Sequence, residues 1–162
     1  MRLELGTFPV KDIVFGGATR YDAGTLTVDR DAVLAAVRQD PRIAMVTTGG
    51  LVRKGNPDKQ VSANPVRYHR HDVAELESLS PKDWEAYHAG YFNHIVNANP
   101  NYILPLSFLR DLERQGKIGK VHEHIYALPG VSTPVAVSAA HGRSIAADLK
   151  AGGVEGALLV AT

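Results

Sequence analysis

The fold is constrained most by two short apolar runs, Ile43–Val46 and Gly156–Ala161. Runs of this length that lack polar alternation and are bounded by turn-forming residues are typical of strands buried on both faces of a sheet. The segment between them contains stretches in which apolar residues recur with helical periodicity. Because alternating helices and buried strands favour a parallel sheet covered by helices, we predict an α/β fold with its functional groups at the carboxyl ends of the strands.

Two helices and one further strand are predicted between these runs. Pro105 opens a helix whose leucines at 106, 109 and 112 form one stripe. Lys120–Ala127 follows as a short strand. Ala136–Lys150 is the second helix, with Thr133 predicted as its N-cap. Lys82–Ala89 fits either a short helix or a strand. Residues 41–162 are therefore predicted to form a Rossmann- or flavodoxin-like α/β domain in which Gly156–Ala161 is central and buried.

Residues 1–40 have a different pattern and are predicted to form a separate, β-rich segment. Short β-branched or apolar runs at Leu3–Leu5, Asp12–Phe15 and Thr25–Val28 are separated by glycine turns, which favours a small antiparallel set. One helix is expected at about Asp31–Gln39, with Asp29 as its N-cap.

Charge and composition exclude several classes of function. The 162 residues carry a formal net charge of +1 and contain no cysteine. The balanced charge argues against nucleic acid binding, and the missing cysteines exclude disulfides, cysteine-ligated zinc and a thiol nucleophile within these residues. No apolar run approaches the ~20 residues that span a bilayer, and residues 1–5 lack the apolar core of a signal peptide. We therefore expect a cytoplasmic protein that contacts no membrane.

Two histidine pairs have the spacing of neighbours on one side of a strand. His122 and His124 would suit a metal ion, but Glu123 is predicted to point away from them, so we expect a solvated or packed pair and no metal. His69 and His71 repeat the spacing beside two arginines. A basic, partly exposed strand explains this second pair, and contact with an anion is the alternative.

Several short motifs follow one another in order along the chain. The first group is Arg2–Leu5, Lys11–Gly16 and Gly24–Val28; the second is Gly49–Val52, Lys54–Asp58, His88–Tyr91 with Asn93, Val96-Asn97, Asn101 and Pro105, and Gly153–Thr162. In this order they resemble the substrate-specific components of the glycine, sarcosine, betaine and D-proline reductases. The first group resembles the proprotein component, and the second, from about residue 43, resembles the selenoprotein B component.

This resemblance implies a reductase-like subunit that acts on amino acid-type substrates. In the family a selenolate or thiolate attacks the carbon next to the leaving amine, and a pyruvoyl carbonyl holds that amine as an imine. His88 and Tyr91 are the implied catalytic residues, and the implied substrate-binding residues are Gly49, Gly50, Asn56, Asn93 and Asn97. Phe92 stands where the family has an aspartate, so one carboxylate beside the histidine is missing.

In the family the strand ending at Thr162 leads directly into the catalytic selenocysteine or cysteine. We expect Thr162 to be a cleavage-site residue: a following cysteine attacks its carbonyl, and elimination leaves a pyruvoyl group on the next chain. A stop at a selenocysteine codon is the other explanation. The expected partner is the polypeptide that follows Thr162, in a hetero-oligomer or dimer of heterodimers that uses a thiol electron donor. The pyruvoyl group on the partner chain is the expected cofactor, with no metal or nucleotide.

Two other functions fit the same residues. A pyruvoyl-dependent lyase or decarboxylase would share the maturation but need no electron donor. A non-catalytic partner domain would need neither. A Cys-Gly-Thr-Cys or selenocysteine continuation would favour reduction over both.

Overall fold

The computed structural model describes residues 8–9, 13–15, 19–21, 25–26 and 41–161. Contacts divide the chain into two units, Met1–Arg38 and Gln39–Thr162. In the first unit, β1 (Phe8–Pro9) pairs with β4 (Thr25–Leu26) and β2 (Ile13–Phe15) pairs with β3 (Thr19–Tyr21), both antiparallel. Strands therefore lie within two of the three predicted runs, whereas the run at Leu3–Leu5 and the helix at about Asp31–Gln39 lie outside the described residues.

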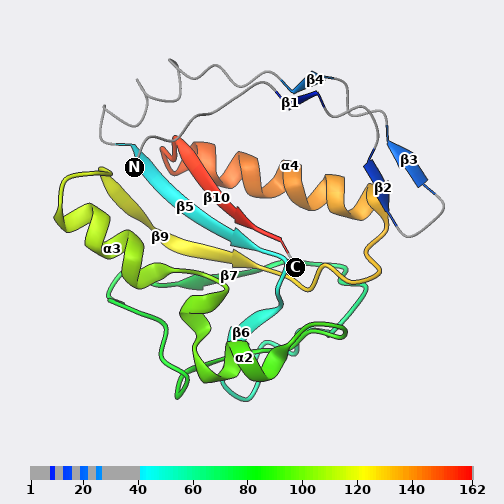
Figure 1. The fold of residues 1–162 in the computed structure, drawn as a ribbon, viewed down its shortest axis with the longest axis horizontal. Helices are drawn as coiled ribbons and strands as arrows, with labels where there is room; N and C mark the ends of the chain where they lie inside the picture. The colour runs from blue at the N-terminus through cyan, green and yellow to red at the C-terminus, as the bar shows by residue number, and fades with distance from the viewer. Residues whose placement is uncertain (1–7, 10–12, 16–18, 22–24, 27–40, 162) are drawn as a thin grey trace. The chain divides into compact units, whose positions relative to one another are not determined.

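The second unit carries the remaining strands and helices (Figure 1). Its strands are β5 (Arg42–Thr47), β6 (Leu51–Arg53), β7 (His69–Asp72), β8 (Trp84–Ala86), β9 (Lys120–Ala127) and β10 (Gly156–Val160). Its helices are α2 (Asn93–Ala98), the 3-10 turn η1 (Pro100–Tyr102), α3 (Leu106–Arg114) and α4 (Val135–Ala151).

The main sheet of this unit has the strand order β10-β5-β9-β7. β10, β5 and β9 are parallel, and β7 runs antiparallel to β9. A separate antiparallel pair joins β6 to β8. A mixed sheet with mostly parallel strands and helices confirms the α/β class, while the narrower Rossmann- or flavodoxin-like topology stays a prediction.

Alternating side chains of the strands build a core on each face of the sheet. One core contains Met45 of β5 and Ile125 of β9 together with leucines of α3, and the other contains their neighbours Ala44 and Tyr126 together with Ile145 and Leu149 of α4. Successive residues of a strand point to opposite faces, which explains this division. Figure 1 shows α4 on one side of the sheet and α3 on the other.

The prediction that Gly156–Ala161 forms a central, buried strand is wrong for the described part of the chain. Within residues 41–161, β10 is at the edge of the sheet and pairs only with β5, so the backbone groups on its other side have no strand partner there. Leu159 is 72% exposed and Leu158 is 37% exposed. An apolar run shows that a segment suits burial, but it does not show which neighbour covers the segment.

Two local predictions are also decided by the structure. Trp84–Ala86 is a strand, so the strand alternative for Lys82–Ala89 is confirmed at its centre. Thr133 is not the N-cap of α4, because Pro134 occupies that position. The Thr133 hydroxyl instead donates to the carbonyl of Gly130 at 3.2 Å, inside the preceding loop. Among the described residues, none of the helices combines the length and apolar character needed to cross a membrane.

Candidate functional site at the carboxyl ends of the parallel strands

The loops that leave β5 and β9 are tied to each other by backbone hydrogen bonds. The Gly50 amide donates to the Leu128 carbonyl at 3.0 Å, and the Gly130 amide donates to the Thr48 carbonyl at 2.8 Å. The Thr48 amide donates to the Val160 carbonyl at 3.1 Å, which adds the end of β10. These bonds fix three strand ends at the edge of the sheet where α/β proteins place their ligands.

A cavity of about 340 Å³ opens between these loops and α4. Its size is at the small end of the range for ligand pockets, roughly 300 to 1,000 Å³. Apolar side chains of β5, β10 and α4 form most of its wall, with a few hydroxyls and one imidazole among them. The lining residues that can hydrogen-bond through their side chains are Thr47, Thr48, Thr133, Ser138 and His141. The cavity therefore suits a small molecule with a limited number of polar groups.

Sequence reasoning missed the contribution of α4 to this cavity. Ser138, His141, Gly142 and Ile145 all line it, and their spacing places them on one helical face. That spacing was visible in the sequence, and a polar serine and histidine within an otherwise apolar stripe were the available signal.

Gly50 is required by the backbone at the entrance to β6. Its φ is +68°, and a Cβ at this position would lie 2.5 Å from the carbonyl oxygen of Tyr87. The Gly50 carbonyl accepts a hydrogen bond from the Tyr87 amide at 2.8 Å. The adjacent Gly49 donates its amide to the Thr47 hydroxyl at 3.0 Å. Both predicted binding glycines thus shape the loop, and Gly50 lets the chain around His88 approach it closely.

His88 lies next to two of the residues predicted to act with it. Its imidazole is 4% exposed and packs edge-on against Tyr91, with 5.9 Å between ring centroids. The Asn93 side-chain amide donates to the His88 carbonyl at 2.9 Å. Burial lowers the pKa of His88, so the imidazole is neutral near pH 7. A neutral, anchored imidazole can accept a proton or orient a ligand more readily than it can supply a proton.

The other two predicted binding residues use their amides on the protein backbone. Asn56 donates to the Gln60 carbonyl and accepts from the Gln60 amide, both at 2.8 Å, which closes the loop after β6. The Asn97 side chain accepts from the Ala86 amide at 2.7 Å and so joins α2 to β8. The Asn97 bond thus holds the end of the strand that leads to His88, whereas the Asn56 bonds lie within their own loop. Thr162 lies outside the described residues.

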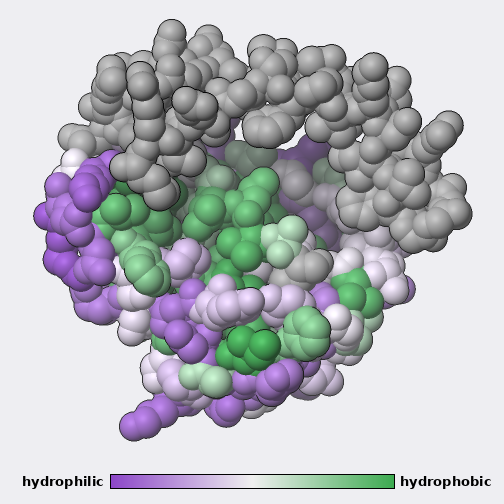
Figure 2. Space-filling view, viewed as in Figure 1, coloured by the Kyte–Doolittle hydropathy of each residue, from purple (hydrophilic) through white to green (hydrophobic). Residues whose placement is uncertain are grey.

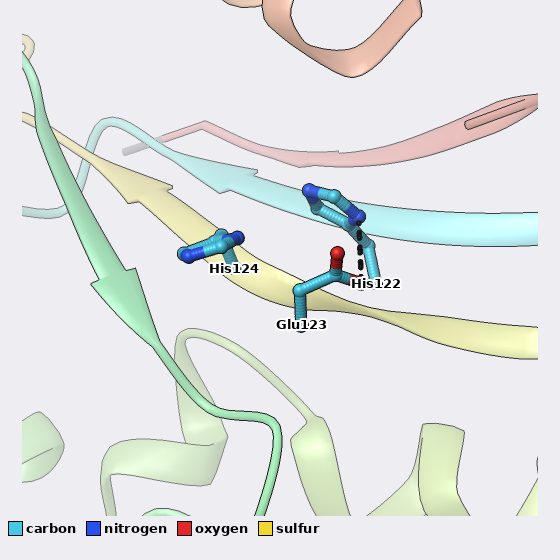
Figure 3. A group of neighbouring side chains, drawn as sticks. All are labelled: His122, Glu123 and His124. Atoms are coloured by element: carbon cyan, nitrogen blue, oxygen red, sulfur yellow. Dashed lines mark ion pairs between the residues drawn. The ribbon is translucent and has the colours of Figure 1, made fainter. Parts of the chain in front are cut away.

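The prediction that Glu123 points away from the two histidines of β9 is wrong. Ile43 pairs with Val121 and Met45 pairs with Ile125, so β9 advances four residues where β5 advances two. This bulge breaks the alternation of side chains at residues 122–124. Figure 3 shows the result: the Glu123 carboxylate turns back to the His122 ring, 3.3 Å from Oε2 to Nδ1.

The other histidine pair divides into a buried and a partly exposed member. His71 is buried against Trp84, with ring centroids 5.3 Å apart, and burial lowers its pKa to about 4. His69 stacks on His71 at 6.2 Å and is less covered. His71 is therefore a packed residue, which leaves only His69 of the pair in reach of an anion.

Together, the fold and the cavity define an α/β protein with a candidate small-molecule site at the carboxyl ends of parallel strands. A family model described as glycine/sarcosine/betaine reductase selenoprotein B matches residues 26–162. The chain belongs to this family.

Curated relatives agree with this assignment. The chain is 42% identical over 120 residues to a glycine reductase complex component B subunit gamma from Carboxydothermus hydrogenoformans, a match that covers 74% of this chain and 28% of the relative. It is 40% identical over 136 residues to a betaine reductase complex component B subunit beta from Peptoclostridium acidaminophilum, covering 83% and 31%. The matched part thus spans less than a third of these relatives.

A shorter match involves another kind of subunit. The sarcosine reductase complex component B subunit alpha of Peptoclostridium acidaminophilum is 36% identical over 67 residues, which cover 41% of this chain and 15% of the relative. No solved structure matches the chain.

Proposed function

We propose that this chain is part of a component B-type reductase that cleaves the carbon–nitrogen bond of a small amino acid or N-methylated amino acid. The observation that carries this proposal is the family match over residues 26–162, which includes every described strand and loop of the cavity. The names of the relatives, with glycine, betaine and sarcosine, suggest the substrate class. The modest cavity volume, about 340 Å³, supports a substrate of that size.

The reaction needs a nucleophile from outside these residues, because the sequence contains no cysteine. A thiolate or selenolate forms a bond to the carbon that bears the amine, and the amine leaves with the electron pair of the broken bond. A second thiolate from the electron donor then attacks the sulfur or selenium. The carbon takes a proton, and the two chalcogens remain joined in an oxidised bond, so two electrons pass to the substrate carbon.

The role proposed for this chain is to enclose and orient the substrate. The apolar wall would exclude water, and hydroxyls such as those of Thr47 and Ser138 would hold polar groups of the substrate. His88 lies at the end of β8 beside the Gly50 loop. His88 is not among the residues that line the cavity, and since its imidazole is neutral near pH 7, we propose that it orients the substrate or accepts a proton.

A pyruvoyl group on a partner polypeptide is the proposed cofactor, and cleavage after Thr162 is its proposed origin. When bound, such a group supplies an electrophilic carbonyl for an amine. The described residues fit a small group of this kind, because the cavity wall near the end of β10 contains Ala161, Gly130 and Gly142. We further propose a hetero-oligomer in the cytoplasm that includes the polypeptide following Thr162.

The test uses the complex purified through a cleavable tag on this chain. With a dithiol present, incubation with glycine, sarcosine or betaine should release ammonia, methylamine or trimethylamine, and the amine that appears identifies the substrate. Release of an amine without consumption of thiol would point to the lyase alternative. Release of none of the three above a protein-free control would overturn the proposed reaction.

Intact-mass spectrometry before and after borohydride tests the cofactor separately. A companion polypeptide whose N-terminus gains hydrogen on reduction is expected, and a companion with an ordinary amino terminus would rule out the pyruvoyl group. Within the active complex, His88→Ala should lower kcat while assembly persists. His94→Ala, an exposed change on α2, is the matched control. Unchanged turnover in His88→Ala would mean that His88 has a structural role.

A further inference from the structure

We propose that His122, Glu123 and His124 form a binding site for a divalent transition metal such as Zn²⁺. All three come from β9, and one ligand atom from each lies within 4.8 Å of the others. None of the three lines the cavity at the strand ends. The site is therefore separate from the proposed reductase chemistry.

The bulge in β9 is the feature that creates this cluster. In a regular strand, residues 122 and 124 would share one face and residue 123 would occupy the other. Three residues of β9 stand opposite the single residue Ala44 of β5, and this extra length lets Glu123 fold back beside the histidines. Bulges are over-represented next to functional sites because they re-aim side chains in this way.

The spacing of the first two ligand atoms already matches the spacing around a metal ion. Nδ1 of His122 and Oε2 of Glu123 are 3.3 Å apart. A tetrahedral ion with bonds of about 2.0 to 2.1 Å separates its ligand atoms by roughly the same distance. The His124 ring, whose centroid is 5.5 Å from that of His122, is only partly buried and can rotate to complete the set.

His122 is both fixed in place and incompletely satisfied. Its side chain is 4% exposed, its ring stacks parallel to Tyr126, and Gly152 packs so closely that a Cβ there would lie 3.1 Å from its Cε1. Yet its buried Nδ1 makes no hydrogen bond within the described residues. A buried nitrogen without a hydrogen bond is costly. An ion bound by this nitrogen would satisfy it.

The ligand types define the class of ion. Two imidazoles and one carboxylate favour zinc and other first-row transition metals over calcium or magnesium, and three protein ligands leave a position open for water. The guanidinium of Arg42 lies 3.3 Å from Oε2 of Glu123 and donates to the Gly152 carbonyl. It is the charge partner of Glu123 in the metal-free state, so metal binding must displace it from the carboxylate.

Isothermal titration calorimetry with Zn²⁺, and visible absorption with Co²⁺, test this site on the tag-free full chain. One ion per chain is expected, with a Co²⁺ spectrum of low coordination number. His124→Ala and Glu123→Gln should each weaken binding by roughly tenfold or more. Arg42→Gln should tighten it, because the competing cation is gone. His94→Ala, on an exposed face of α2, is the control and should bind like the wild type.

Two results would overturn the site. One is the absence of saturable Zn²⁺ or Co²⁺ binding to the wild-type chain. The other is binding that persists in the His124 and Glu123 variants but disappears in His69→Ala, which would move the ion to the other histidine pair. Circular dichroism of each variant establishes that it is folded, so a loss of binding cannot be confused with a loss of structure.

Discussion

Gly50 and Gly55 share a left-handed backbone but differ in their surroundings. Their φ angles are +68° and +79°, and only Gly50 faces a carbonyl at 2.5 Å from the position of an added Cβ. Gly50→Ala should therefore lower the free energy of unfolding by about 2 to 4 kcal/mol, through the clash and the unfavourable φ together. Urea unfolding of the purified chain gives this value.

Comparison with Gly55→Ala separates the effect of the clash from the effect of the unfavourable φ. An alanine Cβ there meets nothing within 4 Å, so the variant should lose only about 1 kcal/mol from its backbone angle. Equal losses in the two variants would show that the close approach of Tyr87 to Gly50 does not contribute.

His71 should make the stability of the chain depend on pH. Its pKa is about 4 in the folded state and about 6.5 when unfolded, so only the unfolded chain takes up the proton between these values. The free energy of unfolding contributed by this residue is therefore present above pH 6.5 and is lost as the pH falls to 4. Between pH 7.5 and 4.5 the loss from His71 is about 2 kcal/mol.

The measurement compares urea unfolding of the wild type and His71→Gln at the two pH values. The variant should lose less stability on acidification, by the amount assigned to His71, whatever its stability at pH 7.5. His94→Gln, at an exposed position, should follow the wild type. If His71→Gln shows the full wild-type dependence, His71 is not the group that titrates.

Residue roles were harder to predict than residue positions. The sequence placed His88 near Tyr91, and the structure brings the two rings together. It did not reveal that the side chains of Asn56 and Asn97 bond to the backbone, because an asparagine that binds a ligand and one that closes a loop have the same local pattern. The turned Glu123 was missed because a bulge depends on the neighbouring strand and leaves no mark in local periodicity.

At the scale of elements, segments with a strong local signal were predicted well. β5 and β9 begin and end within a residue of the predicted strands, since continuous apolar runs or alternation define them. The position of β10 at the sheet edge could not be predicted, because strand order is set by contacts between distant segments. The burial of Arg110, a charged residue in α3, could not be predicted for the same reason.

Arg110 attaches α3 to the loop after β7. Its guanidinium donates to the carbonyls of Val73, Ala74 and Leu76 at 2.9 to 3.1 Å, and it pairs with Glu113 at 2.9 Å. Arg110→Met should lower the free energy of unfolding by about 3 kcal/mol, because three carbonyls that are buried or partly buried lose the guanidinium donor. Urea unfolding, with amide hydrogen exchange of residues 73–76, reports both the loss and its location.

Arg110→Lys and Arg114→Met complete this experiment. A lysine lacks the planar fork that reaches several carbonyls, so it should recover less than half of the lost stability. Arg114 is exposed and, among the described residues, pairs only with acidic side chains at the surface, so its replacement should cost less than about 1 kcal/mol. Full recovery by lysine would mean that charge, and not the fork of hydrogen bonds, fixes α3.

At the scale of the whole molecule, the open edge of β10 is the most informative surface. In the view that Figures 1 and 2 share, hydrophobic residues gather over the part of the surface where Figure 1 draws β10 and β5. The glycine and betaine reductase subunits described above extend well beyond the matched part, which covers only 28% to 31% of their length. We therefore expect the partner polypeptide proposed above to supply the strand that pairs with β10, because an apolar strand edge favours further pairing.

Leu159→Lys tests this expectation in the assembled complex. Leu159 is 72% exposed in this chain, so the substitution should leave the folding of the chain itself nearly unchanged. Leu159 lies on the face of the sheet that also lines the cavity, and a lysine there that the partner covers would lose solvation, so the affinity for the partner polypeptide should fall by roughly tenfold or more. Size-exclusion chromatography with light scattering measures the assembly.

Phe108→Lys is the control. Phe108 lies on α3 and is 69% exposed, so this variant should assemble normally. If Leu159→Lys assembles like the wild type while Phe108→Lys does not, the partner binds the α3 face and β10 remains an edge in the complete protein.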